Sequence, residues 1–138
     1  MKKKIIYIAG YGRCGSSILA LILGQHKNII SLGEIGVIFS ALKHKRICTC
    51  GQKLNNCTYW KQLIKHNEYK KSPNLFLNKL ENPYLKVGIV IDYIFKNSNS
   101  EFLVDSTKTS WRNLTRPLRL ILSGYDVFIM HLKDHKEL

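Results

Sequence analysis

The sequence is short of acidic residues. Only 9 Asp and Glu stand against 22 Lys and Arg in 138 residues, a formal net charge of +13, and no acid precedes Glu34. Such an excess favours anionic partners: nucleotides, nucleic acid, an acidic lipid surface, or sulfated and phosphorylated substrates. The positive charge is densest in residues 41–86. Since hydrophobic residues make up 45%, the composition and length fit one small globular domain.

Long apolar runs are also missing. No uninterrupted apolar stretch approaches the ~18 residues that a membrane-spanning helix needs. The opening MKKKIIYIAG starts like a signal peptide, but Arg13 ends the apolar run and the following GYGRCGSS does not resemble a cleavage site. We therefore predict a soluble, cytoplasmic protein whose cysteines are thiols or metal ligands rather than disulfides.

The order of short patterns predicts an α/β fold with a parallel sheet. The β-branched run at residues 3–10 suits a buried strand, and a helix is expected over residues 16–26, with serines able to cap its start. The other expected elements are a short extended piece with a turn near Gly33, a helical segment near 59–66, a helix at 84–97 for which a strand is the alternative, a strand at 101–105, a helix at 115–124 and a third buried strand at 126–132.

Residues 41–83 have few periodic segments, and we interpret them as a basic insertion or lid over the α/β core. They contain His44, Cys48, Cys50 and Cys57, which supply enough ligand types for tetrahedral zinc. A single residue between the first two cysteines is a tighter spacing than the usual two to four. We therefore favour reduced structural thiols and predict no metal ion in this segment.

The loop GYGRCGSS at residues 10–17 lacks the lysine that follows the last glycine of an NTP-binding P-loop. It lies between the expected first strand and first helix, where backbone N–H groups and the helix dipole attract anions. Arg13 carries the positive charge of the loop, and its planar fork suits a phosphate or sulfate. Ser16 and Ser17 add hydroxyl and amide donors. A tight turn without a ligand is the alternative, but the arginine and the serines favour anion binding.

These residues resemble the sulfotransferases that use 3′-phosphoadenosine-5′-phosphosulfate (PAPS). GRCGSS matches their 5′-phosphosulfate loop, with Cys14 in place of the usual serine. The apolar helix, the His26-Lys27 turn and the following Gly-Glu pair continue the likeness, as do CTCGQKLNNCTYW, FLVDSTKTSWR and FIMHLKDHKEL further on. Together these segments cover most of the chain in the family's order. The resemblance implies that the donor is bound by Gly12, Arg13, Cys14, Gly15, Ser16 and Ser17.

The resemblance implies three further roles. Glu34 matches the catalytic base, Lys108 a lysine near the leaving-group phosphate, and Lys133 an arginine that binds the 3′-phosphate. At Lys133 and His135 the family has Arg and Pro, so a point charge replaces a bidentate fork. The implied fold is a P-loop-type parallel sheet flanked by helices, an incomplete sulfotransferase core. Because the family's later segments would lie beyond residue 138, we expect a truncated N-terminal half or a chain that needs a complementing C-terminal partner.

The leading hypothesis is an enzyme that moves a sulfuryl group from PAPS to a hydroxyl or amine acceptor of unknown identity. Glu34 is the only acid among the first 67 residues and hence the available base, although a solvated loop glutamate is the alternative. Asp105, at a strand end, is expected to cap the next turn. Two hypotheses stay open: a P-loop kinase or NTPase, against which the missing lysine argues, and a non-catalytic basic module that binds an acidic partner or nucleic acid through residues 41–86. A solvated lysine-rich surface is the commoner explanation of that charge, so we do not expect nucleic-acid binding.

Overall fold

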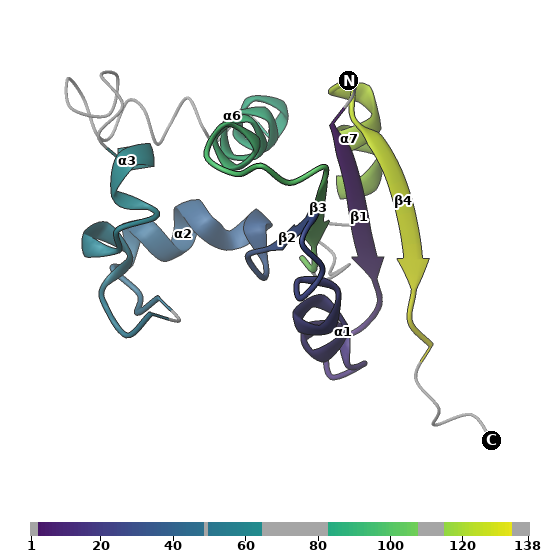
Figure 1. Ribbon diagram of the computed structural model, residues 1–138, viewed down its shortest axis with the longest axis horizontal. Helices are drawn as coiled ribbons and strands as arrows, with labels where there is room; N and C mark the ends of the chain where they lie inside the picture. Colours follow the sequence, from purple (N-terminus) through teal and green to yellow (C-terminus); the bar gives the residue numbers. More distant parts are fainter. Residues whose placement is uncertain (1–2, 49, 65–82, 108–114, 134–138) are drawn as a thin grey trace.

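The computed structural model describes residues 3–48, 50–64, 83–107 and 115–133. Its centre is a four-stranded sheet with the order β2-β3-β1-β4, in which all neighbouring strands run parallel (Figure 1). The strands are β1 (Lys4–Ala9), β2 (Ile29–Ser31), β3 (Phe102–Asp105) and β4 (Asp126–His131). The α/β class predicted from the sequence is therefore confirmed.

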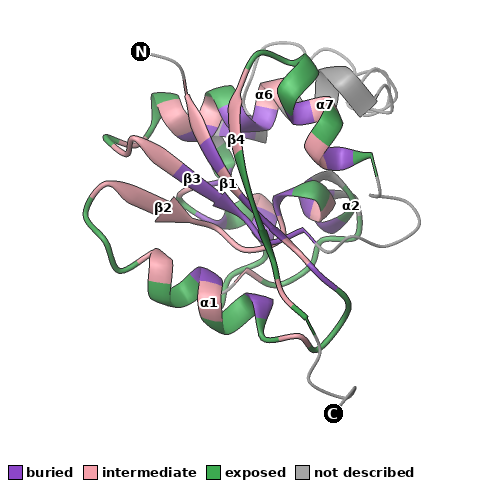
Figure 2. Ribbon diagram, turned by 90° about the vertical axis from the view of Figure 1, so that its right-hand side faces the viewer, coloured by how far each residue is buried: buried purple, intermediate pink, exposed green. Residues whose placement is uncertain are grey.

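Helices cover both faces of the sheet (Figure 2). Helix α1 (Ser16–Leu23) lies on one face, and α2 (Ile38–Lys43), α6 (Pro83–Lys96) and α7 (Arg116–Leu122) lie on the other. The expected helix at 84–97 is thus confirmed, and its strand alternative is wrong. The remaining short elements are the 3₁₀ turns η1 (Ile35–Val37) and η2 (Leu54–Asn56), and α3 (Lys61–Ile64).

The two faces bury different amounts of apolar surface. Successive β1 side chains point to opposite faces, so Ile5 and Tyr7 join the larger core beneath α2, α6 and α7, whereas Ile8 joins a small core with Ala20 of α1. A strand covered on both sides explains the nearly continuous apolar sequence of β1. The segment predicted as an insertion packs into the larger core through Ala41, Leu42, Leu54, Cys57, Trp60 and Leu63.

The last strand differs from the sequence prediction. Residues 126–131 do form a parallel strand, but Phe128 is 52% exposed and Ile129 55% exposed, so the prediction that it is buried is wrong. The physical reason is its place in the sheet: among the described strands β4 pairs only with β1, which makes it an edge. None of the helices in the described ranges combines the length and the apolar character that crossing a bilayer requires.

Candidate functional site

The loop predicted to bind an anion leaves the carboxyl end of β1 and enters α1 (Figure 1). Arg13 has a φ of 67° and Gly15 a φ of 84°, so both adopt the left-handed conformation. Gly15 is the N-cap residue of α1, and its carbonyl accepts a hydrogen bond from Leu19 N–H at 3.0 Å. The sequence predicts that the serines can cap the helix, but they form its first turn instead. No side chain among the described residues caps this helix start. Their N–H groups are thus among the unpaired donors of a helix start.

The three glycines of the loop have different surroundings. A Cβ at Gly10 would lie 2.8 Å from Sγ of Cys14 and 3.2 Å from the carbonyl oxygen of Leu132, so the protein's own packing requires glycine there. A Cβ at Gly12 or Gly15 would meet nothing within 4 Å. The positive φ explains the glycine at 15, whereas nothing in the described protein explains the glycine at 12. The outer side of the loop is open, and the exposed Arg13 belongs to it.

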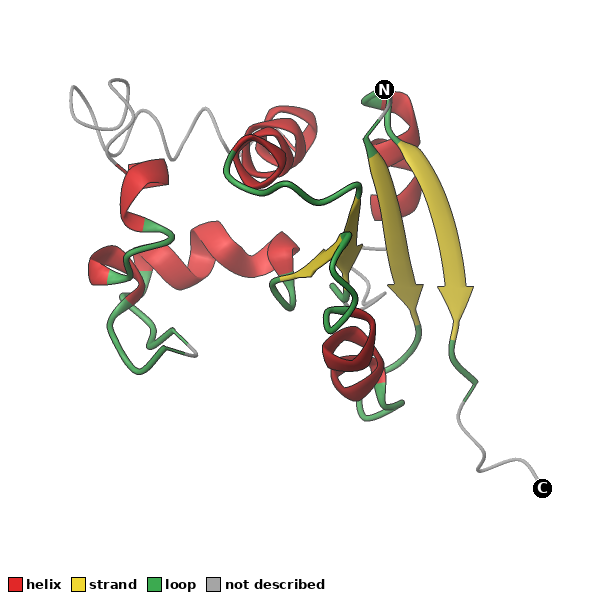
Figure 3. Cartoon of the chain, viewed as in Figure 1, coloured by secondary structure: helices red, strands yellow, loops and turns green. Residues whose placement is uncertain are grey.

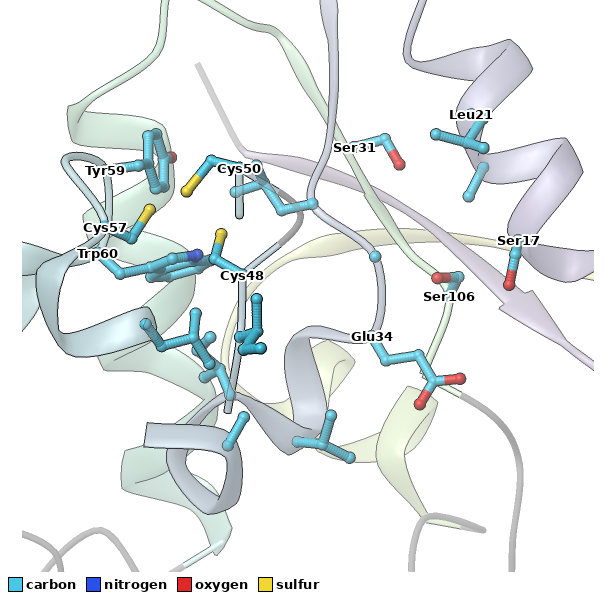
Figure 4. Close-up of a pocket in the computed structure, with 18 residues that line it drawn as sticks. Ser17, Leu21, Ser31, Glu34, Cys48, Cys50, Cys57, Tyr59, Trp60 and Ser106 are labelled. Atoms are coloured by element: carbon cyan, nitrogen blue, oxygen red, sulfur yellow. The ribbon is translucent and has the colours of Figure 1, made fainter. Parts of the chain in front are cut away.

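A cavity of about 700 Å³ separates α1 from the segment that carries the cysteines. Ser17 of α1, Glu34 at the start of η1 and Ser106 after β3 line one end (Figure 4). Three cysteines, Tyr59 and Trp60 line the other end, and mostly apolar side chains lie between. The structure therefore brings two predicted site residues, Ser17 and Glu34, to one cavity.

A buried polar network fixes the backbone that follows Glu34. Asp105 is completely buried and accepts hydrogen bonds from Thr107 N–H at 3.0 Å and from Arg116 Nε at 2.7 Å. Thr107 Oγ1 in turn accepts a hydrogen bond from Gly36 N–H at 2.8 Å. A Cβ at Gly36 would lie 2.6 Å from Thr107 Cγ2, so only glycine allows this approach. The network ties the chain two residues beyond Glu34 to the end of β3.

Asp105 holds the turn after β3, as predicted, through the N–H of the residue two positions on. Its ion pair with Arg116, whose Nη2 lies 2.7 Å from the carboxylate, was not predicted. The sequence contained a signal for this pair. Arg116 is the first residue of α7, and the helix dipole disfavours a cation there, which indicates an acidic partner. A buried carboxylate partner resolves that conflict.

The far end of the cavity holds three cysteine thiols that form no disulfide, and packed aromatic rings. The sulfur atoms of Cys48, Cys50 and Cys57 all lie within 4.8 Å of one another, and His44 is not part of this group. The Gln52 backbone lowers the pKa of the exposed Cys50, but its hydrogen bonds with the neighbouring Cys48 and Cys57 thiols outweigh that effect and raise the pKa above its ordinary value. Trp60 is 5% exposed and stacks on Tyr93 of α6 with ring centroids 6.2 Å apart, which anchors this segment to the core.

The remaining predicted residues lie at or beyond the loop. Leu132 N–H donates to the carbonyl of Ala9 at 2.9 Å. The exposed Lys133 therefore follows β4 at the carboxyl end of the strands, the same end of the sheet as the loop. Cys14 packs beneath Gly10, and Lys108 lies outside the described residues.

Comparisons with protein-family models, curated proteins and solved structures find no match for this chain. Its function must therefore be inferred from its own geometry.

Proposed function

We propose that this chain is a PAPS-dependent sulfotransferase, or the N-terminal half of one, acting on a hydroxyl or amine acceptor. The observation that carries the proposal is the open loop before α1, in which Arg13 and Gly15 are left-handed and no lysine is present. A left-handed conformation costs a residue with a Cβ about 1–2 kcal/mol. Such strain is typical of functional sites, where it is retained because it positions a group for binding.

The loop and its neighbours supply the donors that a phosphosulfate needs. The N–H groups at the start of α1 and the positive end of its dipole suit the 5′-phosphosulfate, and the Arg13 guanidinium takes the place of the absent lysine. Lys133, at the same end of the sheet, is assigned to the 3′-phosphate. Lys108 is assigned to the leaving-group phosphate from the family resemblance alone.

Glu34 is assigned the role of general base. Bound PAPS supplies the sulfuryl group: the acceptor oxygen or nitrogen forms a bond to sulfur while the bond from sulfur to the 5′-phosphate oxygen breaks, and 3′-phosphoadenosine-5′-phosphate leaves with the electron pair. The Glu34 carboxylate takes the proton that the acceptor loses. The support is that Glu34 and Ser17, the last residue of the GYGRCGSS segment, line one cavity. The buried network behind Gly36 holds this part of the chain in place.

The lining of the cavity indicates the kind of acceptor. Between its two ends the walls are apolar, with Leu21, Leu32, Val37, Ile38 and Leu54 among them. Binding sites of this kind usually take ligands with an apolar body and a few polar groups. We therefore expect an acceptor with an apolar body and a single reactive hydroxyl or amine.

Calorimetry with 3′-phosphoadenosine-5′-phosphate tests the proposal without knowledge of the acceptor. Arg13→Ala should weaken binding about 10- to 100-fold, the usual effect of losing a charge-assisted hydrogen bond. Arg46→Ala is the matched control, because it removes an exposed arginine that lies outside both the loop and the cavity lining, and it should change the affinity less than twofold.

Three results would contradict the proposal. If wild type and Arg13→Ala bind 3′-phosphoadenosine-5′-phosphate with equal affinity, the assignment of the loop to the phosphosulfate is wrong. Preferential binding of Mg·ATP would favour a kinase or NTPase. Salt-dependent binding of random oligonucleotides, with no affinity for the nucleotide, would favour a basic module.

A further inference from the structure

Three sulfur atoms from two segments of the chain meet at one end of the cavity. Cys48 and Cys50 belong to a turn, and Cys57 follows η2. Figure 4 shows the three sulfurs turned toward one another, beside Tyr59 and Trp60. Every pair of them lies within 4.8 Å. The sequence predicts reduced structural thiols without a metal, because one residue between Cys48 and Cys50 is a tighter spacing than usual. Spacing along the chain, however, does not give the distances between the sulfur atoms.

The backbone holds this arrangement without help from the thiols. Cys48 N–H donates to the Gln52 carbonyl at 2.7 Å, and Gly51 N–H donates to the Cys48 carbonyl at 2.9 Å. Gly51 has a φ of 84°, which allows the chain to reverse directly after Cys50. Cys57 N–H donates to the Lys53 carbonyl at 3.0 Å, which joins the third cysteine to the end of the same turn.

The sulfur separations suit a shared metal ion better than a disulfide. Zinc–thiolate bonds of about 2.3 Å in tetrahedral geometry put neighbouring sulfurs about 3.8 Å apart. All three pairs lie within 4.8 Å, so small side-chain rotations would bring them to that spacing. A disulfide requires a separation of about 2.05 Å and joins only two of the three sulfurs.

We propose that Cys48, Cys50 and Cys57 bind one zinc ion as thiolates. Binding releases three thiol protons to solvent and leaves a net charge of −1 on the site. The surrounding sequence suits that charge, because Arg46, Lys53 and Lys61 are exposed nearby in the chain and no acid lies between Glu34 and Glu68. The fourth position belongs to water or another small ligand, since all three cysteines line the cavity.

The ion would cross-link a wall of the cavity that has little regular structure. The described residues of 44–48 and 50–60 are mostly loop (Figure 3), and the regular structure among them is the isolated bridge between Ile47 and Lys53 and the short η2. A zinc ion joins the turn at Cys48 and Cys50 to the segment that carries Tyr59 and Trp60. This role is structural and does not depend on the proposed sulfuryl transfer.

Zinc binding to the reduced full-length chain tests the proposal. We expect one zinc ion per chain in competition with a chromophoric chelator, and intense visible bands of tetrahedral thiolate coordination when Co²⁺ is added instead. Cys50→Ser should weaken zinc binding by at least about 100-fold, because losing a ligand exceeds the usual effect of losing an outer-shell partner. Cys50 is exposed, so serine there disturbs no packing. Thr58→Ala, which changes an exposed residue beside Cys57 that is not part of the cluster, is the matched control and should bind zinc like the wild type.

Several outcomes would overturn the proposal. The reduced wild type failing to bind zinc, or Cys50→Ser binding it as tightly, would each do so. A disulfide within the cluster, formed even when zinc is supplied and detected by thiol labelling and mass spectrometry, would indicate a redox pair instead. The Co²⁺ spectrum of the wild type keeps the test decisive if a variant fails to fold. None of these readouts involves nucleotide binding, so they are independent of the sulfotransferase proposal.

Discussion

The two ends of the cavity are built by different means. At one end, Glu34 and Ser17 come from segments attached to the parallel sheet, and the buried Asp105–Arg116 pair fixes the adjoining backbone. At the other end, the cysteines lie on turns with local backbone hydrogen bonds, and core packing of Cys57 and Trp60 holds them against α6, with no strand among the described residues there. An end that places charged groups is thus supported by strands and buried ion pairs. At the end without strands, we assign to zinc the role of an additional cross-link between the turns.

The largest expected effect concerns the support of the first end. Arg116→Met leaves Asp105 buried without its cation, which should lower the free energy of unfolding by about 3–5 kcal/mol, as for other broken buried ion pairs. Chemical denaturation measures it. The double variant Asp105→Leu/Arg116→Met should recover much of the loss, because no charge is then stranded. A single-variant loss below about 1 kcal/mol, the size typical of a surface pair, would contradict this account.

The next prediction tests whether the two ends act independently. Zinc at 100 times its Kd should raise the free energy of unfolding by about 2.7 kcal/mol through linkage. The nucleotide 3′-phosphoadenosine-5′-phosphate at 100 times its Kd should add a similar increment at the other end. Arg13→Ala should remove only the nucleotide effect, and Cys50→Ser only the zinc effect. Loss of both effects in either variant would show that the two ends are coupled.

The smallest expected effect concerns alkaline pH at the thiol end. Burial, aided by nearby Tyr93, raises the pKa of Tyr59 to about 12, and its hydroxyl has no hydrogen-bond partner among the described residues. The raised pKa gives stability that is complete below pH 10 and is lost as the pH rises toward 12. Since the residue is only half-buried, we expect a loss of about 1 kcal/mol.

The Tyr59→Phe variant isolates that contribution. It should flatten the fall in unfolding free energy between pH 10 and 12 relative to wild type, with no loss of stability at pH 7. Tyr125→Phe is a useful comparison, because burial and the neighbouring Asp92, to which the Tyr125 hydroxyl donates a hydrogen bond, also raise the pKa of Tyr125. An unchanged slope in Tyr59→Phe would show that its ionisation does not contribute.

Local patterns predicted the fold better than they predicted the site. The strand–loop–helix around Arg13 follows from a β-branched run, a glycine-rich turn and helical spacing, all within about 20 residues. The exposure of β4 could not be predicted, because an apolar run does not reveal whether its strand lies at the centre or the edge of a sheet. The Asp105–Arg116 pair and the meeting of three sulfurs depend on distances that residue types alone do not specify. The roles of Lys108 and Lys133 stay predictions.

The left-handed backbone at Arg13 sets stability against function at a single position. Glycine would adopt this conformation without strain, although its greater freedom in the unfolded chain offsets part of the gain. Arg13→Gly should therefore fold at least as well as the natural sequence while losing the cation of the loop. Selection for stability alone would favour glycine at position 13, whereas selection for anion binding would retain the arginine.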